Sequence, residues 1–170
     1  MAFSSSYTVY PTLLFLLPVL VVAQTSQNIT LGSSLTAALN QNSSWKSPSG
    51  DFAFGFQQIK AGWFLLATWF DKIPEKTIIW PANGENLVQE GSKIQLTTDG
   101  QFKLSDSKGN EVWVAKLAGS GIVSYAAMLN TGNFVLASQD AINLWESFNL
   151  PTDTIVPTQI LKQGSGLVAR

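Results

Sequence analysis

The chain has 170 residues, with ten basic and eleven acidic side chains and a formal net charge of −1. This length suits one domain with a sizeable core, and so small a charge offers no electrostatic footprint for nucleic acid or an anionic membrane. Histidine and cysteine are both absent, which excludes thiolate nucleophiles, disulfides, imidazole bases and the usual zinc ligands. We therefore expect no metal, no cofactor and no nucleic-acid partner.

The N-terminal segment, residues 1–23, has the pattern of a secretory signal peptide. Leu13 to Ala23 is an apolar run too short to span a bilayer, and it ends in the small residues Val21-Val22-Ala23. We predict cleavage after Ala23, although Met1 to Pro11 carries no Lys or Arg. An uncleaved anchor is the alternative. The rest of the chain has no second apolar stretch of transmembrane length, so a secreted, extracellular protein is expected.

Two glycosylation sequons agree with a secretory route. They are Asn28-Ile29-Thr30 and Asn42-Ser43-Ser44, both in the polar stretch that follows the leader. A glycan on Asn28 or Asn42 would stay in solvent there. Each sequon alone is a weak signal, but together with the leader they favour an extracellular location.

Residues 24–149 are predicted to form one all-β domain, because short apolar or alternating segments recur between turns rich in Gly, Asn and Asp. In chain order the expected strands are Ile29–Leu31, Ser34–Ala37, Asp51–Gln57, Trp63–Phe70, Thr77–Trp80, Lys93–Thr97, Gln101–Ser105, Glu111–Ala115, Ile122–Leu129, Asn133–Ala137 and Ile142–Phe148. Helical periodicity is not evident. Residues 150–170 differ in texture and are expected to be an extended arm, the start of a following segment that is cut short.

A short unit recurs along this domain: a glycine, a phenylalanine two residues later, another apolar residue two further on, and a tryptophan downstream. The copies are Gly50-Asp51-Phe52-Ala53-Phe54, Gly100-Gln101-Phe102-Lys103-Leu104 and Gly132-Asn133-Phe134-Val135-Leu136, followed by Trp80, Trp113 and Trp145. Positions 113 and 145 differ by 32, as do positions 100 and 132. A repeat of fixed period indicates a fold built from stacked or symmetric units.

The three tryptophans are the expected structural core. A buried Trp removes roughly 150–250 Å² from water, which contributes at most about 4–6 kcal/mol. If Trp80, Trp113 and Trp145 point at one axis, three sheets can pack around them without disulfides. The alternative is that each Trp makes ordinary contacts within its own sheet.

At these residues the chain resembles the bulb-type (mannose-binding monocot type) lectin domain, and in particular the N-terminal part of plant G-type lectin S-receptor-like serine/threonine-protein kinases. The stretches that carry the resemblance are Ser47-Pro48-Ser49-Gly50-Asp51-Phe52-Ala53-Phe54-Gly55-Phe56, Trp69-Phe70-Asp71-Lys72-Ile73-Pro74, Ala126-Ala127-Met128-Leu129-Asn130-Thr131-Gly132-Asn133-Phe134-Val135-Leu136, Leu144-Trp145-Glu146-Ser147-Phe148 and Pro151-Thr152-Asp153-Thr154. The resemblance implies a β-prism of three four-stranded antiparallel sheets with pseudo-threefold symmetry.

The resemblance also implies a sugar pocket, Gln-x-Asp-x-Asn-x-Val-x-Tyr, once per repeat. In the third repeat Asn133 and Val135 match, Asn130 approximates the acid with an offset, and Ala137 replaces the tyrosine. In the other two repeats the Asn, Val and Tyr positions fall on Gln101, Lys103 and Ser105, and on Asp51, Ala53 and Gly55. A sugar hydroxyl that loses its partner costs roughly 1–3 kcal/mol. Strong mannose binding is therefore not expected, and Asn130, Asn133 and Val135 are the candidate residual site. For Asn133 we favour a local role at the turn exit.

Three function classes follow. The first is an extracellular lectin-like module, with degenerate pockets for mannose-type glycans, of a plant receptor-like kinase or of a secreted short form; a full-length receptor would place it at the cell surface. The second is a protein-interaction or dimerisation module for a cell-surface partner or another copy. The third is an enzyme with paired carboxylates among Asp99, Asp106 and Glu111. We interpret these acids as solvated turn residues, and no catalytic residue is assigned.

Overall fold

The computed structural model describes residues 28–39, 43–84, 86–161 and 167. The predicted signal peptide, residues 1–23, lies outside these ranges, as do Asn42 and most of the last nine residues. Within the described ranges, no helix is long and apolar enough to cross a membrane.

Almost all regular structure in the described residues is β-strand. The elements are β1 (Ile29–Thr30), β2 (Ser34–Thr36), β3 (Ser44–Lys46), β4 (Phe52–Lys60), β5 (Trp63–Phe70), β6 (Ile78–Pro81), β7 (Val88–Gln89), β8 (Lys93–Leu96), β9 (Phe102–Ser105), β10 (Glu111–Val114), β11 (Tyr125–Met128), β12 (Phe134–Ala137), β13 (Asn143–Glu146) and the 3₁₀ turn η1 (Ser147–Asn149). The two short strands β3 and β7 were not predicted from the sequence, since neither has enough residues to show alternation.

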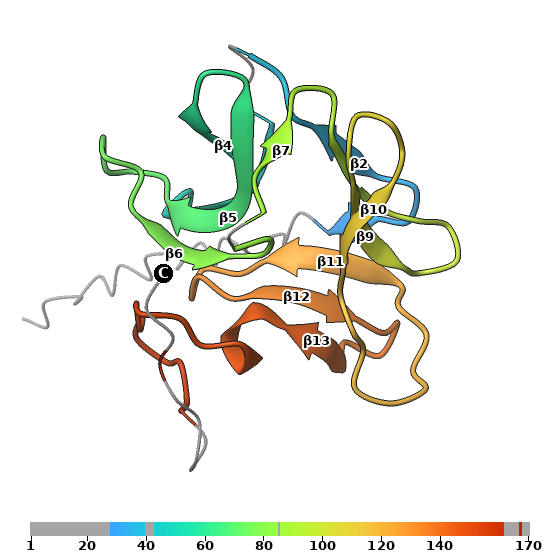
Figure 1. Ribbon diagram of the computed structural model, residues 1–170. Coiled ribbons are helices and arrows are strands. Elements are labelled where there is room, and N and C mark those ends of the chain that lie inside the picture. Colours follow the sequence, from blue (N-terminus) through green and yellow to red (C-terminus); the bar gives the residue numbers. More distant parts are fainter. Residues whose placement is uncertain (1–27, 40–42, 85, 162–166, 168–170) are drawn as a thin grey trace, which may run out of the picture.

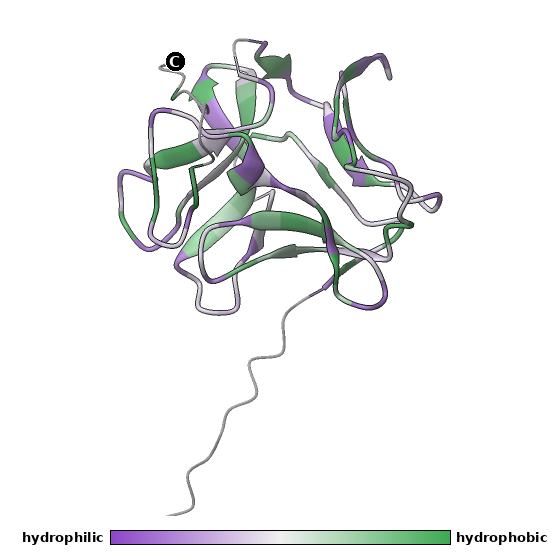
Figure 2. Cartoon of the chain, turned by 90° about the horizontal axis from the view of Figure 1, so that it is seen from below, coloured by the Kyte–Doolittle hydropathy of each residue, from purple (hydrophilic) through white to green (hydrophobic). Residues whose placement is uncertain are grey.

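The strands form three antiparallel sheets around a common centre (Figures 1 and 2). Sheet A has the order β1-β11-β12-β13, sheet B β10-β9-β8-β2, and sheet C β3-β4-β5-β6, with β7 also paired to the start of β5. Figure 2 shows that hydrophobic residues concentrate in the strands of each sheet. The prediction of a three-sheet β-prism is confirmed, with the difference that sheet C has a fifth strand.

The three tryptophans lie together on the prism axis, each contributed by a different sheet. Trp80 is on β6, Trp113 on β10 and Trp145 on β13. Their ring centroids are 5.6 to 6.3 Å apart, and each pair of rings meets edge to face. This is a favourable geometry for aromatic pairs, and it links the three sheets directly.

A second aromatic layer lies beside this hub. Phe54, Phe102 and Phe134 also come from three different sheets, and their ring centroids are 4.0 to 5.8 Å apart. Trp45 of β3 covers them, at 6.1 to 6.2 Å from each of the three rings. The strand β3 therefore closes one end of the core, although the sequence around Trp45 predicts only a chain reversal.

The strand register corrects the first copy of the repeat. Trp113 and Trp145 oppose Leu104 and Leu136, which are the last residues of the second and third copies. Trp80 opposes Thr68 of β5. The equivalent of β9 and β12 in sheet C is thus β5, whereas the Gly50-to-Phe54 segment leads into β4.

The mismatch has a simple physical cause. β4 and β5 are nine and eight residues long, whereas their counterparts have four residues. The turn glycine of sheet C is Gly62, whose φ of 72° compares with 83° for Gly100 and 90° for Gly132. The longer hairpin separates this glycine from Trp80, so the spacing seen in the other two repeats is lost.

The segment that follows η1 lies against sheet C at Thr152 and Val156. The Thr152 hydroxyl is buried and donates a hydrogen bond of 2.8 Å to the carbonyl oxygen of Ile79. Val156 is buried in the core, and the Gln159 side chain donates to the Phe148 carbonyl at 3.3 Å. This part of the expected arm is therefore held on the prism by a buried hydrogen bond and apolar contacts.

Candidate functional site: a groove on sheet C

The outer face of sheet C is set by the alternation of side chains along its strands. On β4, Phe54 and Phe56 join the core cluster, so Gly55 and Gln57 point to the opposite face. Gly55 has a specific function there: a Cβ on it would lie 2.1 Å from the carbonyl oxygen of Ser43. Only glycine lets the backbone of β3 approach β4 this closely, and that approach places Ser44 opposite Gly55 and Lys46 opposite Ala53.

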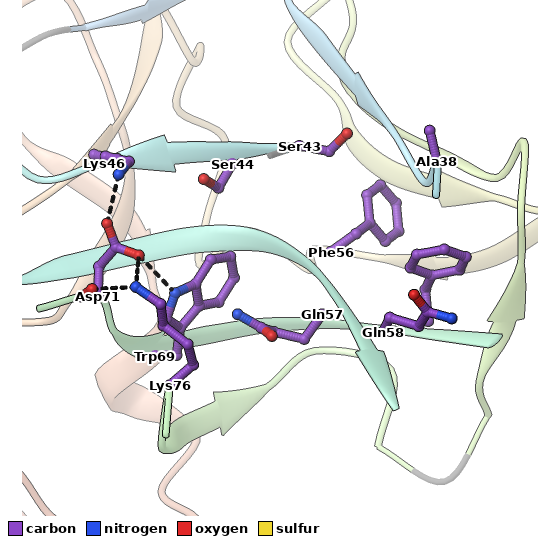
Figure 3. Close-up of a pocket in the computed structure, with 11 residues that line it drawn as sticks. Ala38, Ser43, Ser44, Lys46, Phe56, Gln57, Gln58, Trp69, Asp71 and Lys76 are labelled. Carbon is purple, nitrogen blue, oxygen red and sulfur yellow. Dashed lines mark hydrogen bonds and ion pairs between the residues drawn. The ribbon is translucent and has the colours of Figure 1, made fainter. Parts of the chain in front are cut away.

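A groove of about 350 Å³ lies between β3 and the β4–β5 hairpin (Figure 3). Its lining combines charged, amide, hydroxyl and aromatic side chains. The lining residues are Ala38, Ser43, Ser44, Lys46, Phe56, Gln57, Gln58, Phe64, Trp69, Asp71 and Lys76. Such a mixture of convergent polar groups and apolar walls is typical of small-ligand sites.

A carboxylate with three different donors lies at one end of the groove (Figure 3). Lys46 Nζ is 2.7 Å from Asp71 Oδ2, and Lys76 Nζ is 2.9 Å from Asp71 Oδ1. The indole Nε1 of Trp69 donates to the same Oδ1 at 3.1 Å. Lys76 also donates to the Asp71 carbonyl oxygen. Both carboxylate oxygens are therefore engaged, and the two lysines are held at the same carboxylate.

These contacts determine the charge state of Asp71. Burial alone would raise the pKa of its carboxyl, but the hydrogen bonds from Lys46, Lys76 and Trp69 outweigh burial and lower that pKa from 3.8 to about 2. The carboxylate is thus ionised throughout the physiological range. It acts as a fixed anchor for the two ammonium groups.

The opposite end of the groove is apolar, with the amides between the two ends. Phe56 and Phe64 lie there with centroids 6.5 Å apart, edge to face. Gln58 is exposed and donates weakly to the Lys60 carbonyl at 3.4 Å. Amides and hydroxyls can pair with sugar hydroxyls, and an aromatic wall can contact the apolar face of a sugar ring. Among the described residues of this lining, Asp71 is the single carboxylate, whereas glycoside hydrolysis in its usual form takes two.

Asn133, the main candidate in the third repeat, lies at the start of β12 with its side chain used inside the protein. Its Oδ1 accepts from the Ser147 hydroxyl at 3.1 Å and from the Phe148 amide at 3.2 Å. Its Nδ2 donates to Glu146 Oε2 at 2.7 Å. The residue is only 5% exposed. Asn133 therefore links β12 to η1 and does not simply bond its own backbone.

The other two candidates in that repeat are also engaged or covered. The Asn130 side chain accepts a hydrogen bond of 2.8 Å from the Ser49 amide, which joins sheet A to a turn of sheet C. Val135 is 2% exposed. The structure gives Asn130 and Asn133 different partners in the protein. Their role in carbohydrate binding stays a prediction.

The comparisons with known proteins bear on the family. A family model described as D-mannose binding lectin matches residues 77–165. This chain belongs to that family. A G-type lectin S-receptor-like serine/threonine-protein kinase of Oryza sativa subsp. indica, LECRK2, is 48% identical over 159 residues, which cover 87% of this chain and 19% of the kinase. The kinase RLK1 of Arabidopsis thaliana is 46% identical over 154 residues, covering 84% and 18%.

This lectin-family chain spans about a fifth of the length of these relatives. The matched region is thus the lectin part alone. Among solved structures, the Japanese Marasmius oreades lectin superposes with a TM-score of 0.52 at 18% identity, over 71% of this chain and 88% of that one. At this identity the likeness concerns the fold, and it agrees with the three-sheet prism.

The register also relocates the family's pocket in the first repeat of this lectin domain. Because Thr68 and Leu136 both oppose hub tryptophans, the counterpart of Ala137 in sheet C is Trp69. The Asn, Val and Tyr positions therefore fall on Leu65, Ala67 and Trp69, and the assignment to Asp51, Ala53 and Gly55 is wrong. The aromatic residue at the Tyr position, Trp69, lines the groove.

Of the acids considered for catalysis, Asp99 and Asp106 belong to turns, whereas Glu111 is the exposed first residue of β10, so its interpretation as a turn residue is wrong. Asp106 Oδ1 accepts from the backbone amides of Lys108 and Asn110 at 2.9 and 2.8 Å. Asp99 accepts from the Gln101 side chain at 3.0 Å. Across the described ranges, no group of three or more acidic side chains is placed to hold a metal ion.

The sequence did not single out Lys46, Asp71 and Lys76 as site residues. Asp71 was present in the Trp69-to-Pro74 stretch that carries the family resemblance, but nothing in the chain order places it against Lys46. Of the two sequons, Asn28 is exposed and lines a second hollow together with Ser44 and Lys46. Asn42 lies outside the described residues.

Proposed function

We propose that this chain is an extracellular carbohydrate-recognition module of a plant receptor-like kinase, or of a secreted short form, and that the groove on sheet C is its main glycan site. The observation that carries the proposal is the lining of that groove: amide, hydroxyl and ammonium groups face a solvent-open cavity with aromatic walls. The hydroxyls of a sugar can form hydrogen bonds with such polar groups, and its small apolar face can pack against aromatic walls.

Family membership and the predicted leader support this function and this location. The degenerate motif in the third repeat, with Asn133 engaged internally, argues against strong binding of free mannose. We expect weak recognition of single mannose units and stronger recognition of an oligosaccharide that fills the groove. A residual mannose site at Asn130, Asn133 and Val135 remains part of the proposal, and the Asn133→Ala variant tests it.

A glycan array with the secreted chain tests the carbohydrate proposal. We expect binding to at least one oligosaccharide, and a loss of about tenfold or more in Gln57→Ala, which removes an amide from the groove without touching the core. The matched control is Gln139→Ala in the β12–β13 turn, an exposed amide outside the groove. An array without any bound glycan, obtained with folded protein, would reject the proposal.

A second candidate function is self-association, and one feature favours it. A hollow of about 450 Å³ lies where the edge strands β10 and β13 meet, and it is lined mainly by Val112, Trp113, Val114, Trp145 and Leu150. Leu150 is 48% exposed. Edge strands with apolar neighbours are common sites of association between chains.

Sedimentation velocity at increasing concentration tests this candidate. If the hollow joins two copies, Leu150→Asp shifts the protein to the monomer, whereas Ile160→Asp, which changes an 82% exposed residue outside the hollow, leaves the equilibrium unchanged. A chain that is monomeric at all concentrations would exclude homodimerisation through this surface.

A further inference from the structure

The charged residues of the sheet C groove do not balance. Lys46 and Lys76 contribute two ammonium groups, and Asp71 contributes the single carboxylate among the described residues of the lining. This end of the groove therefore carries a net charge of +1 at neutral pH, on a chain whose formal charge is −1. The charge at this end of the groove is opposite in sign to the net charge of the chain. It therefore results from how these three side chains are placed and not from the overall composition.

The exposures place the positive groups toward solvent. The side chains of Lys46 and Lys76 are 54% and 40% exposed, whereas that of Asp71 is 10% exposed. A ligand that enters the groove meets the ammonium groups before it meets the carboxylate. The carboxylate beneath holds both lysines in place, which lowers the entropy lost when they bind a second anion.

The hydrogen-bonding capacity that remains at this end consists mainly of donors. An ammonium group has three N–H donors. Lys46 directs one at Asp71 Oδ2, while Lys76 directs two at the Asp71 carbonyl oxygen and Oδ1. Both Asp71 carboxylate oxygens already accept hydrogen bonds. A neutral sugar hydroxyl can use these donors only as a weak acceptor, whereas a carboxylate forms charge-assisted hydrogen bonds with them.

We propose that the groove on sheet C selects acidic glycans, with the carboxylate of a uronic acid bound between Lys46 and Lys76 and the neighbouring sugar rings against the amides and aromatic residues of the groove. This inference rests on the proposed carbohydrate-binding function and defines its ligand class. The binding is reversible ion pairing and requires no covalent step.

The length of the surface fits an oligomer better than a single sugar. Lys46 and Ser44 line both this groove and the adjacent hollow that reaches Asn28. The cationic end thus lies between two concave regions. A chain of several uronic acids can extend in both directions from a carboxylate at Lys46, and a glycan on Asn28 would compete for the second region.

The test uses three oligosaccharides of equal length: an oligogalacturonide, its fully methyl-esterified form and a neutral oligomannoside. Calorimetric titration on the glycosylated chain is expected to give about tenfold or tighter binding for the free acid than for the ester. Affinity for the acid should fall as salt rises, because exposed charges are screened over about 8 Å at physiological ionic strength. A fourth ligand, the oligomannoside carrying sulfate groups, separates carboxylate recognition from recognition of any anion.

Two matched variants assign the effect to the groove. Lys46→Gln should remove the preference for the acid, and Lys46→Arg should keep it. Lys72→Gln is the control: Lys72 also makes a 2.7 Å ion pair, with Asp51, and is 63% exposed, but it does not line the groove. Thermal unfolding of each variant verifies that the fold is retained.

The outcomes separate the two proposals. Equal binding of acid and ester that depends on Gln57 overturns the acidic-glycan inference and leaves the carbohydrate function standing. Absence of binding to every glycan rejects both. A preference for the acid that survives Lys46→Gln, or that disappears equally in Lys72→Gln, shows nonspecific charge attraction and overturns the inference. Equal binding of the sulfated ligand contradicts the assignment to uronic acids.

Discussion

The indoles of Trp80 and Trp145 lie edge to face with centroids 5.6 Å apart, although β6 and β13 belong to different sheets. Trp113 completes the cluster at 6.3 and 5.9 Å from these two rings. The contact joins β6 of sheet C to β13 of sheet A. Local pairing within a sheet cannot supply it, so the hub, together with the layer of Phe54, Phe102 and Phe134, holds the sheets together.

Truncation of one hub residue should therefore affect the whole fold. We expect Trp145→Ala to lower the free energy of unfolding by about 3–5 kcal/mol, since it leaves a cavity between all three sheets. Urea unfolding followed by circular dichroism measures the loss. Trp63→Ala at the partly exposed start of β5 is the control and should cost clearly less. Similar losses for both variants would contradict a special role for the hub.

Gly55 should be intolerant of any side chain. A Cβ there would lie 2.1 Å from the Ser43 carbonyl oxygen, so Gly55→Ala must displace β3, at a cost of about 1–3 kcal/mol or more. Glycan binding should fall too, because Lys46 moves with β3. The control is Gly109→Ala, whose Cβ would meet nothing within 4 Å and whose φ of 89° costs roughly 1–2 kcal/mol. Unchanged stability in Gly55→Ala would show that β3 is free to shift.

Substitution of Asn133 tests whether this residue stabilises the fold or contacts a sugar. Asn133→Ala removes the partner of Ser147, Phe148 and Glu146, so we expect a loss of about 1–3 kcal/mol in unfolding free energy. If the third repeat also carries a mannose site, any mannose signal on the array disappears with it. Asn143→Ala, an exposed change on β13, serves as control for stability. Wild-type stability in Asn133→Ala would contradict the structural role.

The low pKa of Asp71 predicts how stability responds to acid. The pKa is lowered from 3.8 to about 2 in the folded protein, so the native state binds the proton less readily than the unfolded chain. The corresponding stability, about 2 kcal/mol at 1.36 kcal/mol per pKa unit, is present above pH 4 and is lost as pH falls toward 2. Asp71→Asn should remove this component.

Urea midpoints at pH 5 and pH 2.5 provide the measurement. The wild-type protein should lose more stability across this interval than Asp71→Asn. Asp140→Asn, which alters an exposed acid of the β12–β13 turn, should follow the wild-type curve closely. An equal acid response in wild type and Asp71→Asn would show that the ion pairs of Asp71 are not stabilising.

Several parts of the fold could be predicted because their signals are local. Trp63–Phe70 was expected as a strand from its apolar run, and β5 has these bounds. The second and third repeats, with Gly100 and Gly132 in left-handed turns, also follow from sequence. The first repeat was misaligned because its turn glycine is Gly62, and the longer hairpin changes the spacing between this glycine and Trp80. A search for a fixed period cannot detect a unit whose spacing has changed.

The candidate site was harder to predict for a different reason. Lys46, Asp71 and Lys76 are ordinary charged residues in or beside turns, and nothing in their spacing indicates a shared contact. They meet because Gly55 admits β3 onto β4, while the β5–β6 connection places Asp71 and Lys76 at the same end of the sheet as Lys46. Conversely, Asn133 matched the family motif, yet its hydrogen bonds go to η1.

By itself the sequence determined the all-β class, the family, the three tryptophans of the core and the absence of thiol or imidazole chemistry, because these depend on residue type and local alternation. Only the tertiary structure decided which strand of sheet C is equivalent to β9 and β12, that Trp45 closes the core, and that two lysines share one carboxylate. Such relations depend on how separate hairpins pack around an axis, and the distances between them are set by the fold as a whole.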